Sequence, residues 1–218
     1  MDQFHGVSRH GVVAGAGPDL SVATLRGRPT RADSRLPRVL DCAARAFRRN
    51  GYHGASVREI ARAVGMLPGS LYCHFASKED LLVAVYEEGV RRLRAAAEHA
   101  LAREADPWRR LETACVAHLE TLLDGSDYAQ VMVRVQPQDV PHAARRLVAA
   151  RDGYERRFGE LIDALPLGAA IGRSDVRLML LGALSWVPTW YRRGKRSPAD
   201  IARAFVELLR IELRGAQP

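Results

Sequence analysis

The sequence has few cysteines, few aromatic residues and no long apolar run. Its 218 residues include three Cys, and these stand far apart at Cys42, Cys73 and Cys115. So few cysteines exclude a disulfide scaffold and are typical of a reduced compartment. No stretch approaches the roughly 18 consecutive apolar residues of a membrane helix, and the N-terminus lacks the basic start and apolar run of a signal peptide. We therefore expect a cytoplasmic protein without a membrane partner.

Motifs for catalysis, metal binding and cofactor binding are also missing from the sequence. The seven His and three Cys are scattered, and they form neither a His-Glu-x-x-His nor a Cys-x-x-Cys pair. A nucleophile elbow and a phosphate-binding loop are absent too. Cys73 and His74 are neighbours, but adjacent residues on a helix point in different directions. We expect a protein that is not an enzyme and that holds neither a metal nor a cofactor.

The composition is that of a globular protein with a basic excess. Hydrophobic residues make up 47% and charged residues 27% of the chain, a balance that excludes a disordered protein. The formal net charge is +8, and an excess of this size favours polyanionic partners. Within the N-terminal third, nearly all basic residues lie between Arg26 and Lys78.

Apolar residues recur at helical spacing along most of the chain. The first such stripe consists of Leu36, Val39, Leu40, Ala43 and Phe47. Asn50-Gly51 is expected to end this first helix. Neither an alternating strand pattern nor an internal repeat is present. The predicted fold class is all-α, with about nine helices that form an N-terminal three-helix unit and a C-terminal helical bundle.

Capping residues and prolines mark the remaining predicted helices. Ser56 and Glu59 form a capping box, Pro68 suits the first position of a short third helix that reaches Phe75, and Ser77 caps the fourth. Later helices are expected at about 78–103, 107–124, 128–135, up to 165, 175–191 and from 198 on. The second and third helices, joined by a turn containing Gly65, fit a helix-turn-helix unit at 56–75.

A glycine-rich segment without periodicity, residues 1–32, precedes the helices and is expected to be a flexible basic tail. It contains Arg26-Gly27-Arg28-Pro29. Two interpretations remain open for this motif: an arm whose Arg28 enters a narrow minor groove, or a solvated basic linker.

Four short strings in the N-terminal third carry a family resemblance. Ser56 to Ala61, Ala63-Val64-Gly65, Gly69 to Phe75 and Ser77 to Leu82 resemble the TetR family of bacterial transcriptional regulators, over Asp33 to about Arg92. The resemblance implies a homodimer with a DNA-binding domain, here residues 33–93, and a separate domain for ligand binding and dimerisation, here residues 94–218. Its partners would be a double-stranded DNA operator, a second copy of the chain and a small-molecule effector.

The resemblance also assigns DNA contacts by position. Tyr72 and His74 correspond to groove-wall and phosphate contacts, and Lys78 to a mobile ammonium that meets a phosphate near a helix N-terminus. Ser70 is placed to read a base edge. The predicted DNA-binding residues are Arg28, Ser56, Arg58, Ser70, Tyr72, His74 and Lys78. Structural roles remain open as alternatives: Tyr72 packed on the fourth helix, and His74 and Lys78 as ordinary surface residues.

The string before the third helix departs from the family pattern. Leu67 stands where a Ser or Thr is usual, and it cannot cap the helix through an oxygen. The loss would cost about 1 kcal/mol of helix stability and removes one phosphate contact. The third helix also lacks Arg, Gln and Asn, so direct base reading there is expected to be weak, with Arg58, Arg28 and DNA shape contributing.

The C-terminal half holds most of the aromatic residues, which suit either an apolar cavity or an ordinary core. The predicted cavity residues are Trp108, Tyr128, Met132, Tyr154, Phe158, Trp186 and Trp190. Residues 181–191 and Ser197-Pro198 resemble TetR regulators that sense acyl-coenzyme A thioesters in fatty-acid and sterol catabolism. That resemblance implies a dimer interface in the last two helices, at Leu184, Phe205 and Leu209. Candidates for the phosphates of such an effector are Arg145, Arg146, Arg151, Arg156 and Arg157.

The sequence thus predicts a ligand-responsive regulator. The expected form is a repressor that binds a palindromic operator and is released by a small hydrophobic or acyl-coenzyme-A-type effector, through a tilt of the fourth helix. Two alternatives of other kinds stay open: an activator of the same fold, and a helical ligand carrier that binds nucleic acid without sequence preference.

Overall fold

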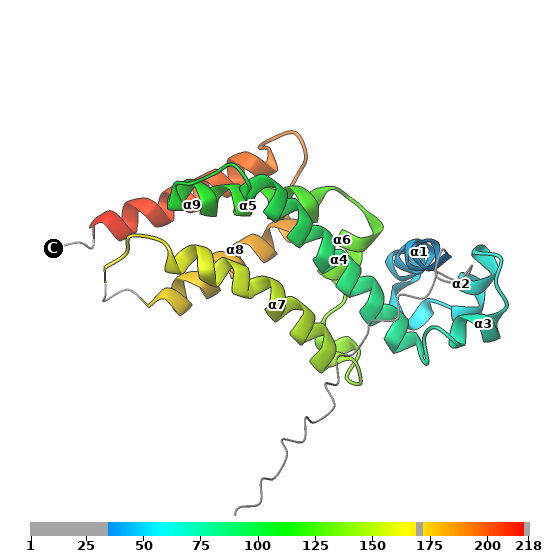
Figure 1. Ribbon diagram of the computed structural model, residues 1–218. Coiled ribbons are helices and arrows are strands. Elements are labelled where there is room, and N and C mark those ends of the chain that lie inside the picture. The colour runs from blue at the N-terminus through cyan, green and yellow to red at the C-terminus, as the bar shows by residue number, and fades with distance from the viewer. Residues whose placement is uncertain (1–34, 169–171, 216–218) are drawn as a thin grey trace, which may run out of the picture. The chain divides into compact units, whose positions relative to one another are not determined.

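The computed structural model describes residues 35–168 and 172–215, and within these ranges every regular element is a helix (Figure 1). The elements are α1 (Leu36–Gly54), α2 (Val57–Ala63), α3 (Pro68–Tyr72), α4 (Lys78–Leu101), α5 (Pro107–Leu123), α6 (Asp127–Arg134), the 3-10 turn η2 (Pro137–Asp139), α7 (Ala144–Asp163), α8 (Arg173–Trp190) and α9 (Pro198–Gly215). The all-α prediction is confirmed. The predicted tail, residues 1–32 with Arg28, lies outside the described residues.

Side-chain caps begin α2 and α4, as the sequence predicted. The Ser56 hydroxyl accepts a hydrogen bond from the Glu59 amide at 3.4 Å, and the Ser77 hydroxyl accepts one from the Asp80 amide at 3.0 Å. Such caps satisfy amides that lack partners within the helix. Leu67, in contrast, provides no side-chain cap to α3, so Pro68 at the first helical position starts that helix alone.

Two helix ends differ from the prediction. Helix α1 continues to Gly54, past a break at Gly51, whose φ of 66° and ψ of 175° leave the helical region. Glycine tolerates this conformation because it has no Cβ, and one further turn forms beyond it. Helix α3 ends at Tyr72, earlier than expected. His74 instead lies in a turn, where its amide bonds to the Leu71 carbonyl at 3.0 Å.

One hydrophobic core joins α1–α3 and the first half of α4 to α6 and the start of α7. Val39, Phe47, Ile60 and Leu71 are its buried residues in the first three helices. Tyr128, Val131 and Leu147 of α6 and α7 pack into the same core. The predicted boundary at residues 93 and 94 therefore does not separate two independent cores, since the helix-turn-helix unit shares its core with later helices.

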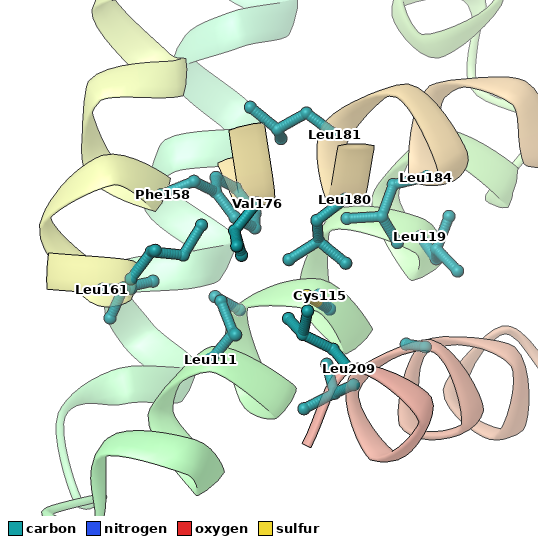
Figure 2. Close-up of a cluster of buried hydrophobic side chains, with 14 of the residues drawn as sticks. Leu111, Cys115, Leu119, Phe158, Leu161, Val176, Leu180, Leu181, Leu184 and Leu209 are labelled. Carbon is teal, nitrogen blue, oxygen red and sulfur yellow. The ribbon is translucent and has the colours of Figure 1, made fainter. Parts of the chain in front are cut away.

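A second core lies among α4, α5, α7, α8 and α9. Figure 2 shows its centre, where side chains of α5, α7, α8 and α9 point toward one another. The labelled residues are Leu111, Cys115, Leu119, Phe158, Leu161, Val176, Leu180, Leu181, Leu184 and Leu209. Helix α4 contributes Val90 and Leu93 to this core and Leu81, Leu82 and Val85 to the first. It is thus one continuous helix with a share in both cores.

Along residues 35–168 and 172–215, every helix is too short or too polar to span a bilayer.

Candidate nucleic-acid interface and ligand cavity

The turn between α2 and α3 fixes how the third helix is presented. Gly65 adopts a φ of 69°, and although a Cβ there would meet open space, this backbone conformation is costly for other residues. After the turn, Leu71 is buried in the first core, and Phe75 packs partly buried against it. Because one side of α3 is held down in this way, its other side faces outward.

The residues predicted to contact DNA from α2, α3 and the following turn are exposed. Arg58, Ser70, Tyr72 and His74 all lie on the surface, and Tyr72 keeps 49% of its area accessible. Ser56 is half-buried and caps α2. These placements satisfy the geometric requirement for contact with a duplex, and the contacts themselves stay a prediction.

Lys78 is not the mobile ammonium that the sequence suggested. Its Nζ donates to the carbonyls of His53 and Ala55, both at 3.1 Å, and lies 4.6 Å from the centre of the Tyr52 ring. Carbonyls at the end of α1 lack helical partners and carry the negative end of the helix dipole, which attracts a cation. Lys78 therefore ties the end of α1 to the start of α4. One of its three N–H groups remains for a phosphate.

Acidic residues in the first turn of α4 are also engaged. Tyr52 donates its hydroxyl to the Glu79 carboxylate, and this bond lowers the pKa of Glu79. Asp80 pairs with Arg146 of α7, and the hydrogen bond from Arg146 lowers the pKa of Asp80. Arg146, a candidate for binding effector phosphates, is thus occupied in linking α7 to α4.

A polar junction joins α6 to α1 and α4. Asp127 pairs with Arg48 at 2.8 Å and with Arg45 at 3.6 Å. The Tyr128 hydroxyl donates to Asp41 at 2.9 Å, and the Arg92 guanidinium lies 3.9 Å from the centre of the Tyr128 ring. The prediction that Tyr128 lines the cavity is therefore wrong, because its ring is buried at this junction.

A cavity of about 170 Å³ lies among α4, α5, α6, α7 and α8. Its apolar wall includes Val90, Leu93 and Leu122, and its more polar side includes Arg151 and Glu155, whose side chains form an ion pair at 3.2 Å. The full lining is Tyr86, Val90, Leu93, His118, Leu122, Met132, Val133, Val135, Gln136, Pro137, Arg151, Tyr154, Glu155, Leu181 and Ser185.

Of the predicted cavity residues, Met132 and Tyr154 line this cavity. Trp108 and Phe158 instead belong to the second core. Trp186 and Trp190 lie on the protein surface, and Trp186 is 66% exposed. Their placement in the cavity was wrong, because the buried side of α8 is formed by the stripe Leu180, Leu184 and Val187, and the tryptophans project from other sides of the helix.

The predicted interface residues do not form an exposed surface. Leu184 is completely buried, and Leu209 is buried as well, so both serve the core of the protomer itself. Phe205 is half-buried. Among residues 173–211, the large apolar residues that α8 and α9 expose are Leu178, Met179, Trp186, Trp190, Leu208 and Ile211.

The cavity wall contains a buried histidine that the sequence analysis did not single out. His118 lies 5% exposed, and its Nδ1 is 3.1 Å from the Tyr154 hydroxyl. Burial lowers the pKa of His118 to about 4, so the ring is neutral at neutral pH. The sequence does contain a pattern that indicates a buried histidine, because position 118 lies within the apolar stripe of Leu111, Cys115, Leu119 and Leu122.

Two family models match the chain. The model for bacterial regulatory proteins of the tetR family matches residues 39–85. The model for the tetracyclin repressor-like C-terminal domain matches residues 104–212.

Known proteins resemble the chain over most of its length. The HTH-type transcriptional repressor KstR2 of Mycobacterium tuberculosis is 29% identical over 192 residues, which are 85% of this chain and 94% of KstR2. The fatty acid metabolism regulator protein of Bacillus subtilis is 25% identical over 177 residues, 78% of this chain and 91% of the regulator. The crystal structure of AibR in complex with isovaleryl coenzyme A and operator DNA has the same fold, with a TM-score of 0.66 and 22% identity, over 80% of this chain and 97% of AibR.

Proposed function

The chain belongs to the TetR family of bacterial regulatory proteins, and from this premise we propose that it is a repressor. It binds a palindromic operator as a homodimer and leaves the DNA when a small hydrophobic or acyl-coenzyme-A-type effector fills the cavity. Residues 33–93 form the DNA-binding part and residues 94–218 the part that senses the effector and dimerises. The names of KstR2, a repressor, and of the Bacillus regulator of fatty acid metabolism favour this assignment.

The outward face of α3 is the observation that carries the DNA-binding proposal. Leu71 holds the helix in the core, and Ser70 and Tyr72 are exposed beside it, as a reading helix in a major groove requires. Arg58 forms no ion pair with any residue that the structure describes, unlike Arg48, which is held by Asp127. A guanidinium without an ion-pair partner at this exposed position on α2 is available for a phosphate or a guanine.

The remaining DNA contacts are of two kinds: phosphate contacts that position the protein on the duplex, and groove contacts that give sequence preference. Ser56, through its amide, and Lys78, through its one remaining N–H, approach phosphates near the starts of α2 and α4. Tyr72 and His74 meet the groove wall. Arg28 lies outside the described residues, and for it we propose a minor-groove contact that adds sequence preference through groove shape.

A second copy of the chain covers the exposed apolar residues of α8 and α9. Leu178, Gly182 and Trp186 follow each other at spacings of four residues and so lie along one side of α8. A Cβ at Gly182 would meet nothing within 4 Å, so this position leaves room for a partner helix. On α9, Leu208 and Ile211 are exposed three residues apart. Exposed apolar side chains gathered in this way are typical of protein interfaces.

Helices α4 and α6 carry the response from the cavity to α1. Met132 and Val133 of α6 line the cavity, while Asp127 and Tyr128 of the same helix hold α1. An effector that favours a different position of α6 or α4 shifts the distance between the two reading helices of the dimer. Operator affinity then falls by the ratio of effector affinities for the two states.

Selection of random duplex DNA by the purified protein at physiological salt, followed by sequencing, tests this function. We expect an enriched palindrome whose half-sites are about one DNA turn apart. Arg58→Ala should abolish the enrichment, and Arg109→Ala, at an exposed position on α5, is the matched control. Binding without enrichment, with a steep salt dependence that is equal for all sequences, would instead support a non-specific nucleic-acid-binding ligand carrier.

Transcription in vitro from a promoter that contains the selected site separates a repressor from an activator. Lower transcript yield on addition of the protein is the expected result. A higher transcript yield would instead show that the protein is an activator.

A further inference from the structure

The histidine in the cavity wall uses only part of its hydrogen-bonding capacity. His118 Nδ1 meets the Tyr154 hydroxyl at 3.1 Å, but among residues 35–168 and 172–215 its Nε2 has no hydrogen-bond partner and is shielded from solvent. Most buried polar atoms in proteins are paired, and an unpaired one destabilises the fold. His118 is among the residues that line the cavity, and its unpaired Nε2 points to a bound molecule that completes the pair. Because Nε2 is closed to solvent, this molecule reaches it by displacing a neighbouring side chain.

The hydrogen bond to Tyr154 determines which chemical group His118 offers. If the Tyr154 hydroxyl donates to Nδ1, both of these groups are satisfied and only an Nε2–H is left. If Nδ1–H donates instead, the phenolic hydrogen and the Nε2 lone pair both lack partners within the part of the chain that the structure describes. The first tautomer leaves fewer groups unsatisfied, so His118 presents a hydrogen-bond donor.

The ring is held between aromatic neighbours and carries no charge. Tyr154 stacks on His118 with ring centres 5.7 Å apart, and Phe158 meets it edge-on at 5.8 Å. The Arg151 and Glu155 side chains that line the same cavity pair with each other. A neutral donor in this setting suits a neutral carbonyl oxygen, whereas a carboxylate would lose its hydration without gaining an opposite charge.

The cavity also limits the size of the group that enters. Its volume is about 170 Å³, and an engineered apolar cavity of about 150 Å³ accommodates benzene. The buried part of a ligand should therefore contain roughly six to eight non-hydrogen atoms, a short branched chain or a single ring.

From the orphaned Nε2, the fixed ring and the cavity volume, we propose that His118 donates a hydrogen bond to a neutral carbonyl oxygen on a small apolar group of the effector. Tyr154 acts as a positioning residue that sets the tautomer and the orientation of the ring. The proposal rests on the proposed function, for which it names the chemistry of the effector.

Three matched probes test this recognition: 4-methyl-2-pentanone, the hydrocarbon 2-methylpentane, and the carboxylate 3-methylbutanoate. Their affinities are measured by NMR titration of the full-length protein. The ketone should bind more tightly than the carboxylate. His118→Phe, which preserves a flat apolar ring, should reduce the preference for ketone over hydrocarbon roughly three- to tenfold, the value of one net hydrogen bond. His99→Gln, at an exposed position on α4, should leave this preference unchanged.

Nitrogen-15 NMR of the His118 ring supplies an independent readout. We expect a protonated Nε2 and an unprotonated Nδ1, with the reverse tautomer becoming populated in Tyr154→Phe. The proposal is overturned if the ketone preference is the same in His118→Phe, if none of the probes binds, or if Nδ1 carries the proton in the parent protein. Operator selection by the same samples separates this failure from that of the proposed function, because His118 lies on α5, which carries none of the predicted DNA contacts.

Discussion

Gly89→Ala should compress the contact between α4 and α6 beside the cavity. Gly89 is buried on α4, and a Cβ there would lie 2.7 Å from Sδ, 3.1 Å from Cγ and 3.2 Å from Cε of Met132. Since real Cβ atoms essentially never approach below 3.0 Å, the Met132 side chain must move. Met132 lines the cavity, so its displacement changes the space available to an effector.

Two opposing effects set the size of the stability change. Alanine gains about 1 kcal/mol over glycine inside a helix, whereas overpacking of a core costs about 1–3 kcal/mol. Methionine is flexible and absorbs part of the strain, so we expect a net loss of about 0–2 kcal/mol in the free energy of unfolding. The larger effect should be on the affinity for a molecule that enters the cavity, because Met132 lines the cavity.

A double-mutant cycle with Met132→Ala isolates this contact. Unfolding in urea and titration with 4-methyl-2-pentanone are measured for the parent, both single variants and the double variant. Removing the Met132 side chain should relieve the clash, so that Gly89→Ala becomes stabilising by about 1 kcal/mol in the Met132→Ala background. Strictly additive effects on stability would refute the reasoning, since they would show that the two side chains do not meet.

Four further outcomes follow from the structure. Tyr72→Ala should lower operator affinity in an electrophoretic mobility assay with little change in the melting temperature, because the ring is 49% exposed; unaltered affinity would remove Tyr72 from the interface. Trp186→Glu should shift the sedimentation mass from dimer to monomer without unfolding the protomer, and an unchanged dimer would place the interface elsewhere. Tyr128→Phe should lower the free energy of unfolding in urea by about 1 kcal/mol, because the hydrogen bond to Asp41 is lost. An unchanged free energy of unfolding would show that this bond does not stabilise the protein. Burial lowers the pKa of His118 from 6.5 to about 4, so the free energy of unfolding should fall as the pH decreases from about 6.5 to 4. The fall should be smaller in His118→Phe, and identical pH profiles of the two proteins would contradict a buried neutral imidazole.

Local signals in the sequence were sufficient to predict the helices and the helix-turn-helix unit. Ser56 and Ser77 cap α2 and α4 as predicted, because a cap depends on residues three positions apart. Leu71 and Phe75, which pack into the first core, lie four residues apart, a spacing that places both on one side of a helix. The sequence predicts the break at Gly51 but not the helical turn that follows it. In that turn the Ala55 amide donates to the Gly51 carbonyl at 3.2 Å, beyond a residue that normally ends a helix.

Contacts between distant segments could not be read from the sequence. Lys78 bonds to carbonyls more than 20 positions earlier, and Tyr128 bonds to Asp41 across 87 positions. The prediction misplaces the tryptophans of α8 for another reason: aromatic character alone does not show that a side chain is buried. Trp186 follows Leu184 by two residues, which is roughly 200° around a helix, so a buried Leu184 directs Trp186 away from the core.

The core that α1–α3 share with α6 and α7 limits how this protein can be recombined with its relatives. A chimera joined at residue 93 would pair a foreign α1 with Tyr128 and Val131 of this chain, and it would break the ion pair between Arg48 and Asp127. A transplant that keeps Tyr128 and Asp127 with their own α1 preserves these contacts. The portable DNA-reading module is thus discontinuous along the chain, and grafting it onto another sensor requires the transfer of α6 together with α1–α4.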